Sequence, residues 1–173
     1  MTIHLGPLSP AIDPPPKANP RADGYGDNPR CVRRDISNYL SSRYSRTQDI
    51  VSLINNSRDI NTFQNVMQAV APIGVHVAGH YTIAGDPGGD FYTSPNDPAF
   101  WVHHGMIDRS WSIWQTQDLA NRQLVIAGGS SMMGFGRAQS LDDPVDLGVV
   151  GDKVYKIRDL VSTVDGPFCY AYE

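Results

Sequence analysis

Four of the five histidines, His76, His80, His103 and His104, fall within 29 residues of the chain. His76 and His80 stand four positions apart, so on a helix their rings lie on one face about 6 Å apart, close enough to share a metal ion. His103 and His104 are adjacent and therefore about 100° apart around a helix, so we expect only one of them to bind the same ion. The spacing predicts a metal site made from the first pair and one member of the second.

The neighbours of His104 favour it over His103 as the third ligand. Phe100, Ile107 and Trp111 lie four residues before it, three after it and seven after it, which places His104 on the inward, aromatic face of a helix. A buried imidazole costs free energy unless each ring nitrogen finds a partner, and a metal ion is one such partner. We therefore expect His104 to complete the site, with His103 supporting the ligands without binding the metal.

Three neutral imidazoles without a thiolate or carboxylate ligand suit copper or zinc, and they leave a coordination position open for a small ligand. Asp108 follows His104 by one helical turn and is a candidate to orient a ligand imidazole, the alternative being an ion pair with Arg109 or another arginine. Two histidines four apart are more often ordinary helical residues than ligands, so the third histidine is what favours a metal. We expect His4, in a proline-rich segment, to be solvated.

The candidate ligands fall on two expected helices. A short helix is predicted within residues 73–83 and a long one from about residue 97 to residue 118. Asn96 or Asp97 can cap the long helix, and the proline that follows suits its first turn, where the missing N–H costs nothing. Between the two helices, residues 85–90 read Gly-Asp-Pro-Gly-Gly-Asp, which forces turns.

Earlier in the chain the pattern is also helical. Thr47 can cap a helix that carries the apolar residues of 50–54, and Asp59 or Asn61 can cap one that carries those of 63–70. Together with the two histidine-bearing segments, these helices predict a mainly α fold.

Irregular structure is expected on both sides of the helices. Residues 1–30 are rich in proline and should form an extended arm, leaving 31–173 as the folded part. Beyond residue 119 we expect long loops, a short helix at 154–161, and a single short strand at 168–172, where apolar and other residues alternate.

The composition excludes several classes of protein. The chain has 173 residues, 40% of them hydrophobic, and a net charge of −4 without blocks of like charge, so neither a nucleic acid nor an anionic membrane is an expected partner. No apolar run reaches the roughly 20 residues that cross a bilayer, and the start of the chain shows no signal peptide. Two cysteines, Cys31 and Cys169, are too few for a disulfide scaffold; they pair with each other or are unrelated thiols.

The histidine segments carry a resemblance to a known family. Gly74-Val-His-Val-Ala-Gly-His80, then Gly88-Gly-Asp-Phe91, then Ser94-Pro-Asn-Asp-Pro-Ala-Phe-Trp-Val-His-His-Gly-Met-Ile-Asp-Arg-Ser-Trp111 resemble the second copper-binding half of tyrosinases, above all fungal tyrosinase-like and catechol oxidase-like proteins. The pattern Asp-Pro-x-Phe-x-x-His-His-x-x-x-Asp-Arg-x-Trp is long and specific. The likeness extends to the flanking Asn28-Pro-Arg-Cys31 and Gly166-Pro-Phe-Cys-Tyr-Ala-Tyr172.

The resemblance implies a type-3 copper centre, in which two coppers inside a four-helix bundle bind dioxygen together and oxidise phenols. It matches this chain to the helix pair of the second copper, with ligands His76, His80 and His104. Phe100 matches a buried aromatic beside the centre. Phe91 falls near a bulky residue that restricts access above the copper in some members, a core phenylalanine being the alternative.

Other family features bear on the activity. Members that hydroxylate monophenols, and so act as monooxygenases, often carry asparagine directly after the first ligand, where this chain has Val77. The resemblance therefore favours oxidation of o-diphenols to o-quinones. Cys31 and Cys169 lie at the two flanks of the family-like region, which favours their pairing in a disulfide; the thioether-linked cysteine of some members belongs to the first half.

The chain departs from the family pattern in its ligand count. The first-copper half should contribute three further histidines before this region, and only His4 precedes it, in a segment that resembles the linker between the halves. We therefore expect ligands for one copper here, with a first-copper half or a second copy of the chain needed for oxidase activity. The alternatives are a mononuclear copper-binding module or inactive remnant, and, less favoured by the motif, histidines that belong to a metal-free core. Without its other helices, the aromatic face of the long helix would be partly uncovered.

Overall fold

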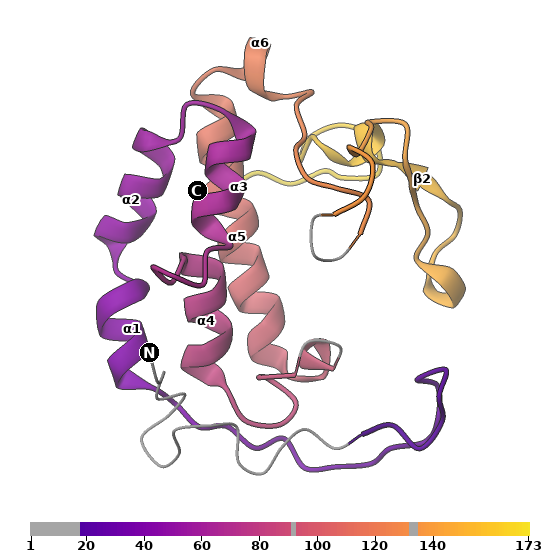
Figure 1. The fold of residues 1–173 in the computed structure, drawn as a ribbon. Coiled ribbons are helices and arrows are strands. Elements are labelled where there is room, and N and C mark those ends of the chain that lie inside the picture. Colours follow the sequence, from indigo (N-terminus) through magenta and orange to yellow (C-terminus); the bar gives the residue numbers. More distant parts are fainter. Residues whose placement is uncertain (1–17, 91–92, 132–134) are drawn as a thin grey trace. The chain divides into compact units, whose positions relative to one another are not determined.

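A computed structural model describes residues 18–90, 93–131 and 135–173, and it is mainly helical (Figure 1). The chain divides into two compact units. Unit 1 comprises the described residues up to Ser52 together with Met67–Asp108, and unit 2 comprises Leu53–Val66 and Arg109–Glu173. All four clustered histidines belong to unit 1. The proline-rich arm predicted at 1–30 lies partly outside the described residues, and its described part has no helix or strand.

Unit 1 is built on the packing of α1 (Asn38–Tyr44) against α4 (Val75–Ile83). Ser37 caps α1 by accepting a hydrogen bond from the backbone N–H of Leu40 at 3.3 Å. The core between the two helices contains Leu40, Ile73 and Ala78, all buried, with Tyr44, Val77 and Tyr81 packed around them. This core fixes the face of α4 that points away from the histidines.

The start of α5 (Pro98–Thr116) is anchored by one buried carboxylate. Asp97 accepts a hydrogen bond from the backbone N–H of Ala99 at 2.8 Å, as a helix-capping aspartate does. The same carboxylate forms a two-pronged ion pair with Arg34, at 2.9 and 2.7 Å. The segment that precedes α1 therefore holds the first turn of the helix that carries His103 and His104. A 3-10 turn, η1 (Ser94–Asn96), leads into it.

A second buried carboxylate, Asp86, lies in the turn after α4. It pairs with Arg30 at 3.2 Å and with Arg33 at 3.7 Å, and the backbone of Arg33 exchanges two hydrogen bonds with the backbone of Asp86, at 2.7 and 2.9 Å. The chain from Arg30 to Ser37 thus runs beside the end of α4, since Ser37 also donates its N–H to the carbonyl of Thr82.

The remaining elements complete the chain. α2 (Thr47–Asn56) has Thr47 as its first residue, whereas we expected Thr47 as the cap before the helix. α3 (Ile60–Met67) is capped by the predicted Asp59, which accepts a hydrogen bond from the N–H of Thr62 at 2.7 Å. In unit 2 the side chain of Trp114 is fully buried, lies 5.1 Å from the ring of Phe63, and donates to the carbonyl of Ser57.

The last third of the chain is mostly irregular, as predicted. It contains α6 (Leu119–Arg122), a two-stranded antiparallel sheet of β1 (Pro144–Val145) and β2 (Tyr155–Lys156), and the 3-10 turns η2 (Gly148–Val150) and η3 (Ile157–Leu160). The helix expected at 154–161 is therefore a short strand followed by a 3-10 turn. None of the helices in the described part of the chain is long and apolar enough to cross a membrane.

The strand expected at 168–172 is wrong. Residues 168–173 form neither helix nor strand in the structure. The N–H of Tyr170 bonds to the carbonyl of Thr163 at 2.9 Å, which ties the tail to the preceding loop without extending into a ladder. Alternation of side chains is not sufficient for a strand when no neighbouring strand supplies the hydrogen bonds.

Candidate metal centre

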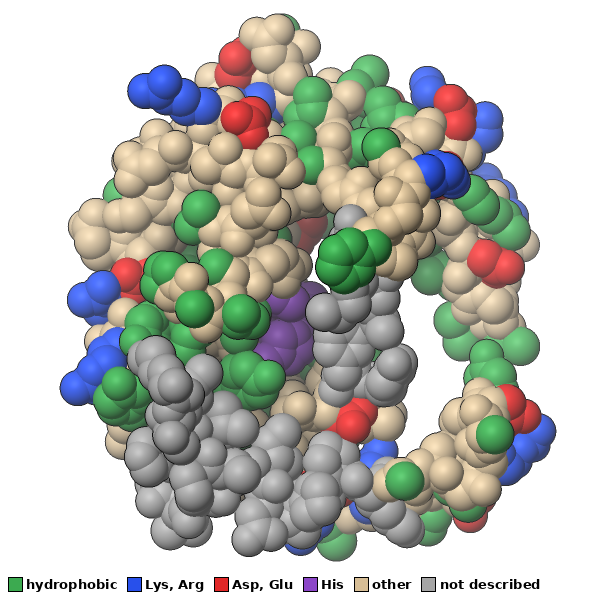
Figure 2. Space-filling view, viewed as in Figure 1, with side chains coloured by type: hydrophobic (Ala, Val, Ile, Leu, Met, Phe, Trp, Pro, Cys, Tyr) green, Lys and Arg blue, Asp and Glu red, His purple; other side chains and the backbone are tan. Residues whose placement is uncertain are grey.

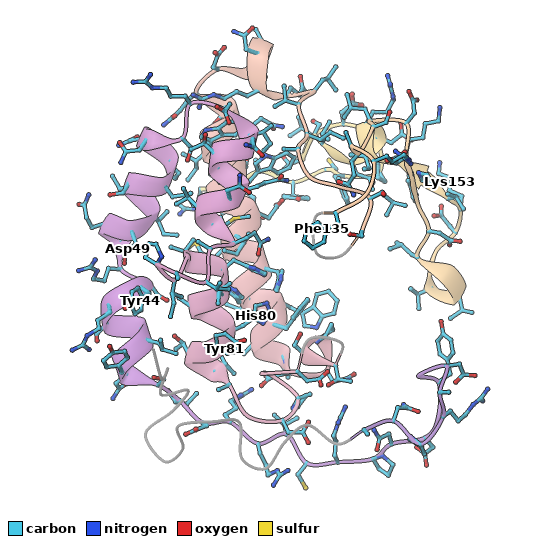
Figure 3. All side chains as sticks on the ribbon, viewed as in Figure 1. Tyr44, Asp49, His80, Tyr81, Phe135 and Lys153 are labelled. Carbon is cyan, nitrogen blue, oxygen red and sulfur yellow. The ribbon has the colours of Figure 1, made fainter. Side chains whose placement is uncertain are left out.

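Helices α4 and α5 bring the four histidines of unit 1 into one cluster. His76 and His80 lie one turn apart on α4, while His103 and His104 lie on the first half of α5. All four are half-buried, and histidine side chains reach the surface in the space-filling view (Figure 2). Figure 3 shows His80 between the two helices. The prediction that these two segments would come together is confirmed.

The Nε2 atoms of three histidines meet at His76. Nε2 of His76 lies 3.1 Å from Nε2 of His80 and 3.1 Å from Nε2 of His104. The rings of His76 and His80 stand nearly perpendicular, with centroids 4.7 Å apart, and the ring of His104 lies 5.1 Å from that of His76. The Nε2 atoms of His80 and His104 therefore each lie against Nε2 of His76.

The opposite nitrogens of two of these rings, in His76 and His104, are held by oxygen acceptors. Nδ1 of His76 lies 2.6 Å from the side-chain oxygen of Gln68, and Nδ1 of His104 lies 3.0 Å from the backbone carbonyl of Phe100. An oxygen of this kind carries no hydrogen, so Nδ1 is the donor and Nε2 keeps its lone pair. Two such lone pairs facing each other at 3.1 Å repel unless a cation lies between them. The donor set therefore fits a metal ion.

His103 occupies a different place in the cluster. Its Nε2 lies 2.9 Å from the backbone carbonyl of His76, to which it donates, and its ring stacks on that of His76 at 5.5 Å with 12° between the planes. Gly79 makes room for it, since a Cβ at position 79 would lie 2.1 Å from Cε1 of His103. His103 thus joins α5 to α4 across a gap that only glycine leaves open.

A second grouping of nitrogens includes His103. One ring nitrogen from each of His76, His80 and His103 lies within 4.8 Å of the other two. Mutual distance among the described residues thus groups His103 with His76 and His80, while His104 approaches Nε2 of His76 to 3.1 Å. The hydrogen bonds distinguish His103 from His104 as a third ligand, because Nε2 of His103 is engaged with a backbone carbonyl, whereas Nε2 of His104 faces Nε2 of His76.

Burial favours the neutral form of three of the histidines. The pKa of His76 is lowered to about 3, mainly by burial and in part by the neighbouring histidines. The pKa of His103 is lowered to about 4, again mainly by burial. Burial also lowers the pKa of His80, against the effect of a hydrogen bond to the backbone of Gly88. Neutral imidazole is the form that binds metals.

The other residues singled out from the sequence fall in several places. The ring of Phe100 stacks on that of His104, with centroids 3.8 Å apart, and lies 5.9 Å from that of His80. Val77 is half-buried and packs on the α1–α4 core. Asp108 is half-buried one turn beyond His104, and its orienting role stays a prediction. Phe91 lies outside the described residues.

The aromatic face predicted for the long helix is partly uncovered, as expected for a chain without the other helices of the bundle. Phe100, His104, Ile107 and Trp111 are each half-buried. The cysteines predicted to pair, Cys31 and Cys169, are free exposed thiols that belong to different units. Their pairing stays a prediction.

Comparison with known proteins agrees with this geometry. The family model described as the common central domain of tyrosinase matches residues 1–117. The chain belongs to the tyrosinase family. Membership implies copper as the metal and explains the mainly helical fold.

Individual relatives show the same likeness. The chain is 35% identical over 176 residues to "Tyrosinase P" of Aspergillus terreus, covering 98% of this chain and 48% of that protein. It is 38% identical over 136 residues to "Tyrosinase-like protein orsC" of Emericella nidulans, covering 76% and 35%. Its structure matches that of a mutant polyphenol oxidase from Thermothelomyces thermophila with a TM-score of 0.81 and 34% identity, over the whole of this chain and 49% of that one. The chain thus spans about half the length of these tyrosinases and polyphenol oxidases, or less.

Two residues of this tyrosinase-family site, Gly79 and Gln68, were not predicted from the sequence. Gly79 carries a signal, since a glycine inside a helix is unfavourable and so indicates a packing requirement. Gln68 carries none, because its contact with His76 depends on the turn between α3 and α4.

A cavity of about 710 Å³ in unit 2, whose described lining includes Lys153, Tyr155 and Arg158, contains no histidine and is not part of the site.

Proposed function

We propose that His76, His80 and His104 bind one copper ion through their Nε2 atoms. The observation that carries the proposal is the meeting of these atoms, 3.1 Å from His76 to each of the other two. Ligand nitrogens about 2 Å from a metal at tetrahedral angles lie about 3.3 Å apart, so the spacing suits one ion. Imidazole ligands suit both copper and zinc, and the family favours copper.

The activity we propose for the centre is that of a tyrosinase-type or catechol oxidase-type oxidoreductase. Copper supplies a metal that accepts electrons from phenols and passes them to dioxygen. In the overall reaction two o-diphenols each lose two electrons and two protons to become o-quinones, and one O₂ takes up the four electrons and four protons to give two waters. The chain's own residues hold the Nε2 lone pairs in place, and Phe100 covers one face of His104.

The residue after the first ligand bears on the choice of phenol. Val77 has no hydrogen-bonding side chain and packs on the apolar core formed with Leu40 and Ala78. It cannot hold a proton-accepting water beside His76. This supports o-diphenols over monophenols as substrates.

The ligand count supports a second candidate function, a mononuclear copper-binding module without turnover. Of the five histidines in the sequence, three form the proposed site, His103 bonds to the carbonyl of His76, and only His4 remains. This chain therefore supplies ligands for one copper. Oxidase activity then requires a second copper site, from a first-copper half or a second copy of the chain.

Copper titration tests the metal site. We expect the expressed chain to bind one copper per chain and the variant His104→Ala to lose stoichiometric binding, while His4→Ala, a matched control, binds like the wild type. Absence of stoichiometric binding in the wild type, or its full retention in His104→Ala, contradicts the proposal.

Catechol turnover, measured with the mass in solution, separates the two candidate functions. Quinone formation by a species with two coppers supports the oxidoreductase. One copper per monomer with no turnover supports the binding module.

A further inference from the structure

Gln68 lies outside the helices, and its side chain contacts the ring of His76. Gln68 follows α3, and the chain then turns back, with a bridge between Val70 and Ile73 and a 2.7 Å hydrogen bond from the N–H of Gly74 to the carbonyl of Ala69. This turn brings the side-chain oxygen of Gln68 to within 2.6 Å of Nδ1 of His76.

We propose that Gln68 is a positioning residue that fixes the tautomer and orientation of His76. Its amide oxygen accepts the Nδ1 proton, so Nε2 of His76 is left with the lone pair that faces His80 and His104. The inference rests on the proposed copper site, in which Nε2 of His76 is a ligand. Hydrogen bonds of this kind to the second nitrogen of a ligating histidine orient the ring and raise its basicity.

The other two proposed ligands depend on the backbone instead. His104 donates to the carbonyl of Phe100 within its own helix, and His80 has a hydrogen bond to the backbone of Gly88. Those contacts come with the fold and change little when a side chain is replaced. Gln68 is an exposed side chain, so the orientation of His76 can be altered without disturbing a core.

The first experiment reads the tautomer in the copper-free protein. Nitrogen NMR of the histidine rings should show His76 protonated at Nδ1 in the wild type and in Gln68→Glu. In Gln68→Leu, which keeps a side chain of similar size but removes the acceptor, the Nε2-protonated form should become populated. The control Gln48→Leu removes an exposed glutamine of α2, whose side chain bonds only to Ser52 within the described contacts, and should leave His76 unchanged.

The second experiment measures Cu(I) affinity by competition with a chromophoric chelator. Loss of the orienting contact should weaken binding 10- to 100-fold in Gln68→Leu, the range typical of such contacts, while Gln68→Glu binds at least as tightly as the wild type. Circular dichroism melting confirms that the variants fold.

The two experiments distinguish a failure of the role proposed for Gln68 from a failure of the proposed copper site. Unchanged tautomer and unchanged affinity in Gln68→Leu, or a wild-type His76 protonated at Nε2, overturn the role of Gln68. A wild type that binds no stoichiometric copper but shows the tautomer change in Gln68→Leu overturns the proposed copper site and leaves the orienting contact standing.

Discussion

Single residues of the cluster have separate tasks despite their shared chemistry. His76 and His104 present Nε2 to a common point because their Nδ1 atoms donate to oxygens. Nε2 of His103 instead donates to the carbonyl of His76, and the His103 ring fills the space beside Gly79. The same side chain therefore serves as a proposed ligand at three positions and as a link between helices at the fourth.

The pairing of Gly79 with His103 predicts the effect of a methyl group. Alanine is favoured over glycine inside a helix by about 1 kcal/mol, yet its Cβ would lie 2.1 Å from Cε1 of His103. Overpacking typically costs about 1–3 kcal/mol, so we expect Gly79→Ala to destabilise the protein by about 1 kcal/mol. Urea unfolding measures the change.

A double variant checks that the clash is with His103. In the background His103→Ala, the change Gly79→Ala should stabilise α4, because the ring that meets the new Cβ is gone. Equal effects of Gly79→Ala in both backgrounds would show that the two residues are not coupled.

Sequence reasoning predicted the ligand candidates for a physical reason. The spacing of His76 and His80, and the face of His104, follow from helical periodicity, which depends on local sequence alone. The contact of Gln68 with His76 depends on the path of the turn between α3 and α4, and no local pattern encodes that path.

At the scale of the elements, α5 has a long-range anchor at its first turn. The predicted cap of this helix at Asp97 is confirmed. The ion pair between Asp97 and Arg34, which also holds the start of the helix, was not predicted from the sequence. Arg34 lowers the pKa of the Asp97 carboxyl by its hydrogen bond. The segment before α1 and the start of α5 are therefore fixed together.

Substitution of Asp97 separates the cap from the charge. Asp97→Asn keeps an oxygen that can accept from the N–H of Ala99 but loses the ion pair, whereas Asp97→Ala loses both. We expect both to destabilise the protein, Asp97→Ala by about 1 kcal/mol more than Asp97→Asn, the usual value of a helix cap. Thermal and urea unfolding give the comparison, and equal stability of Asp97→Ala and the wild type would exclude the anchor.

Helix ends were predicted better than the last third of the chain. Asp59 and Asp97 act within their own turns, so a capping residue is visible in the sequence. The 168–172 tail and the β1–β2 pair depend on which distant backbone groups meet. Alternation at 168–172 could not supply a partner strand.

The stability of the whole copper-free chain should depend on pH through the histidines. The pKa values of His76 and His103 in the folded protein, about 3 and about 4, lie below the ordinary value of 6.5. The unfolded chain therefore binds more protons than the folded chain below pH 6.5. The contribution of these two histidines to the free energy of unfolding is fully present above pH 6.5 and is lost as the pH falls toward 4 and 3.

Urea unfolding at pH 7.5 and 5.5 tests this dependence above the range in which most carboxylates titrate. The free energy of unfolding should be lower at pH 5.5 than at pH 7.5. The control His4→Ala should show the same decrease between the two pH values. Equal stability at the two pH values contradicts the burial of His76 and His103 as neutral imidazoles.

Exposed apolar residues predict the behaviour of the chain in solution. Trp101, Val102 and Met106 on α5 are 64%, 78% and 48% exposed. Contiguous apolar surface promotes association, so light scattering should show a mass that rises with concentration. Val102→Lys with Met106→Lys should reduce the rise, while Val149→Lys, a fully exposed valine in unit 2, should not. A monomer at all concentrations contradicts the prediction.

The central claim is that three imidazoles, from His76, His80 and His104, hold one copper. X-ray absorption at the copper edge counts the imidazole ligands of the loaded chain. We expect three in the wild type and in His103→Ala, and fewer in His104→Ala. Three imidazoles retained in His104→Ala, with a loss in His103→Ala, would contradict the assignment.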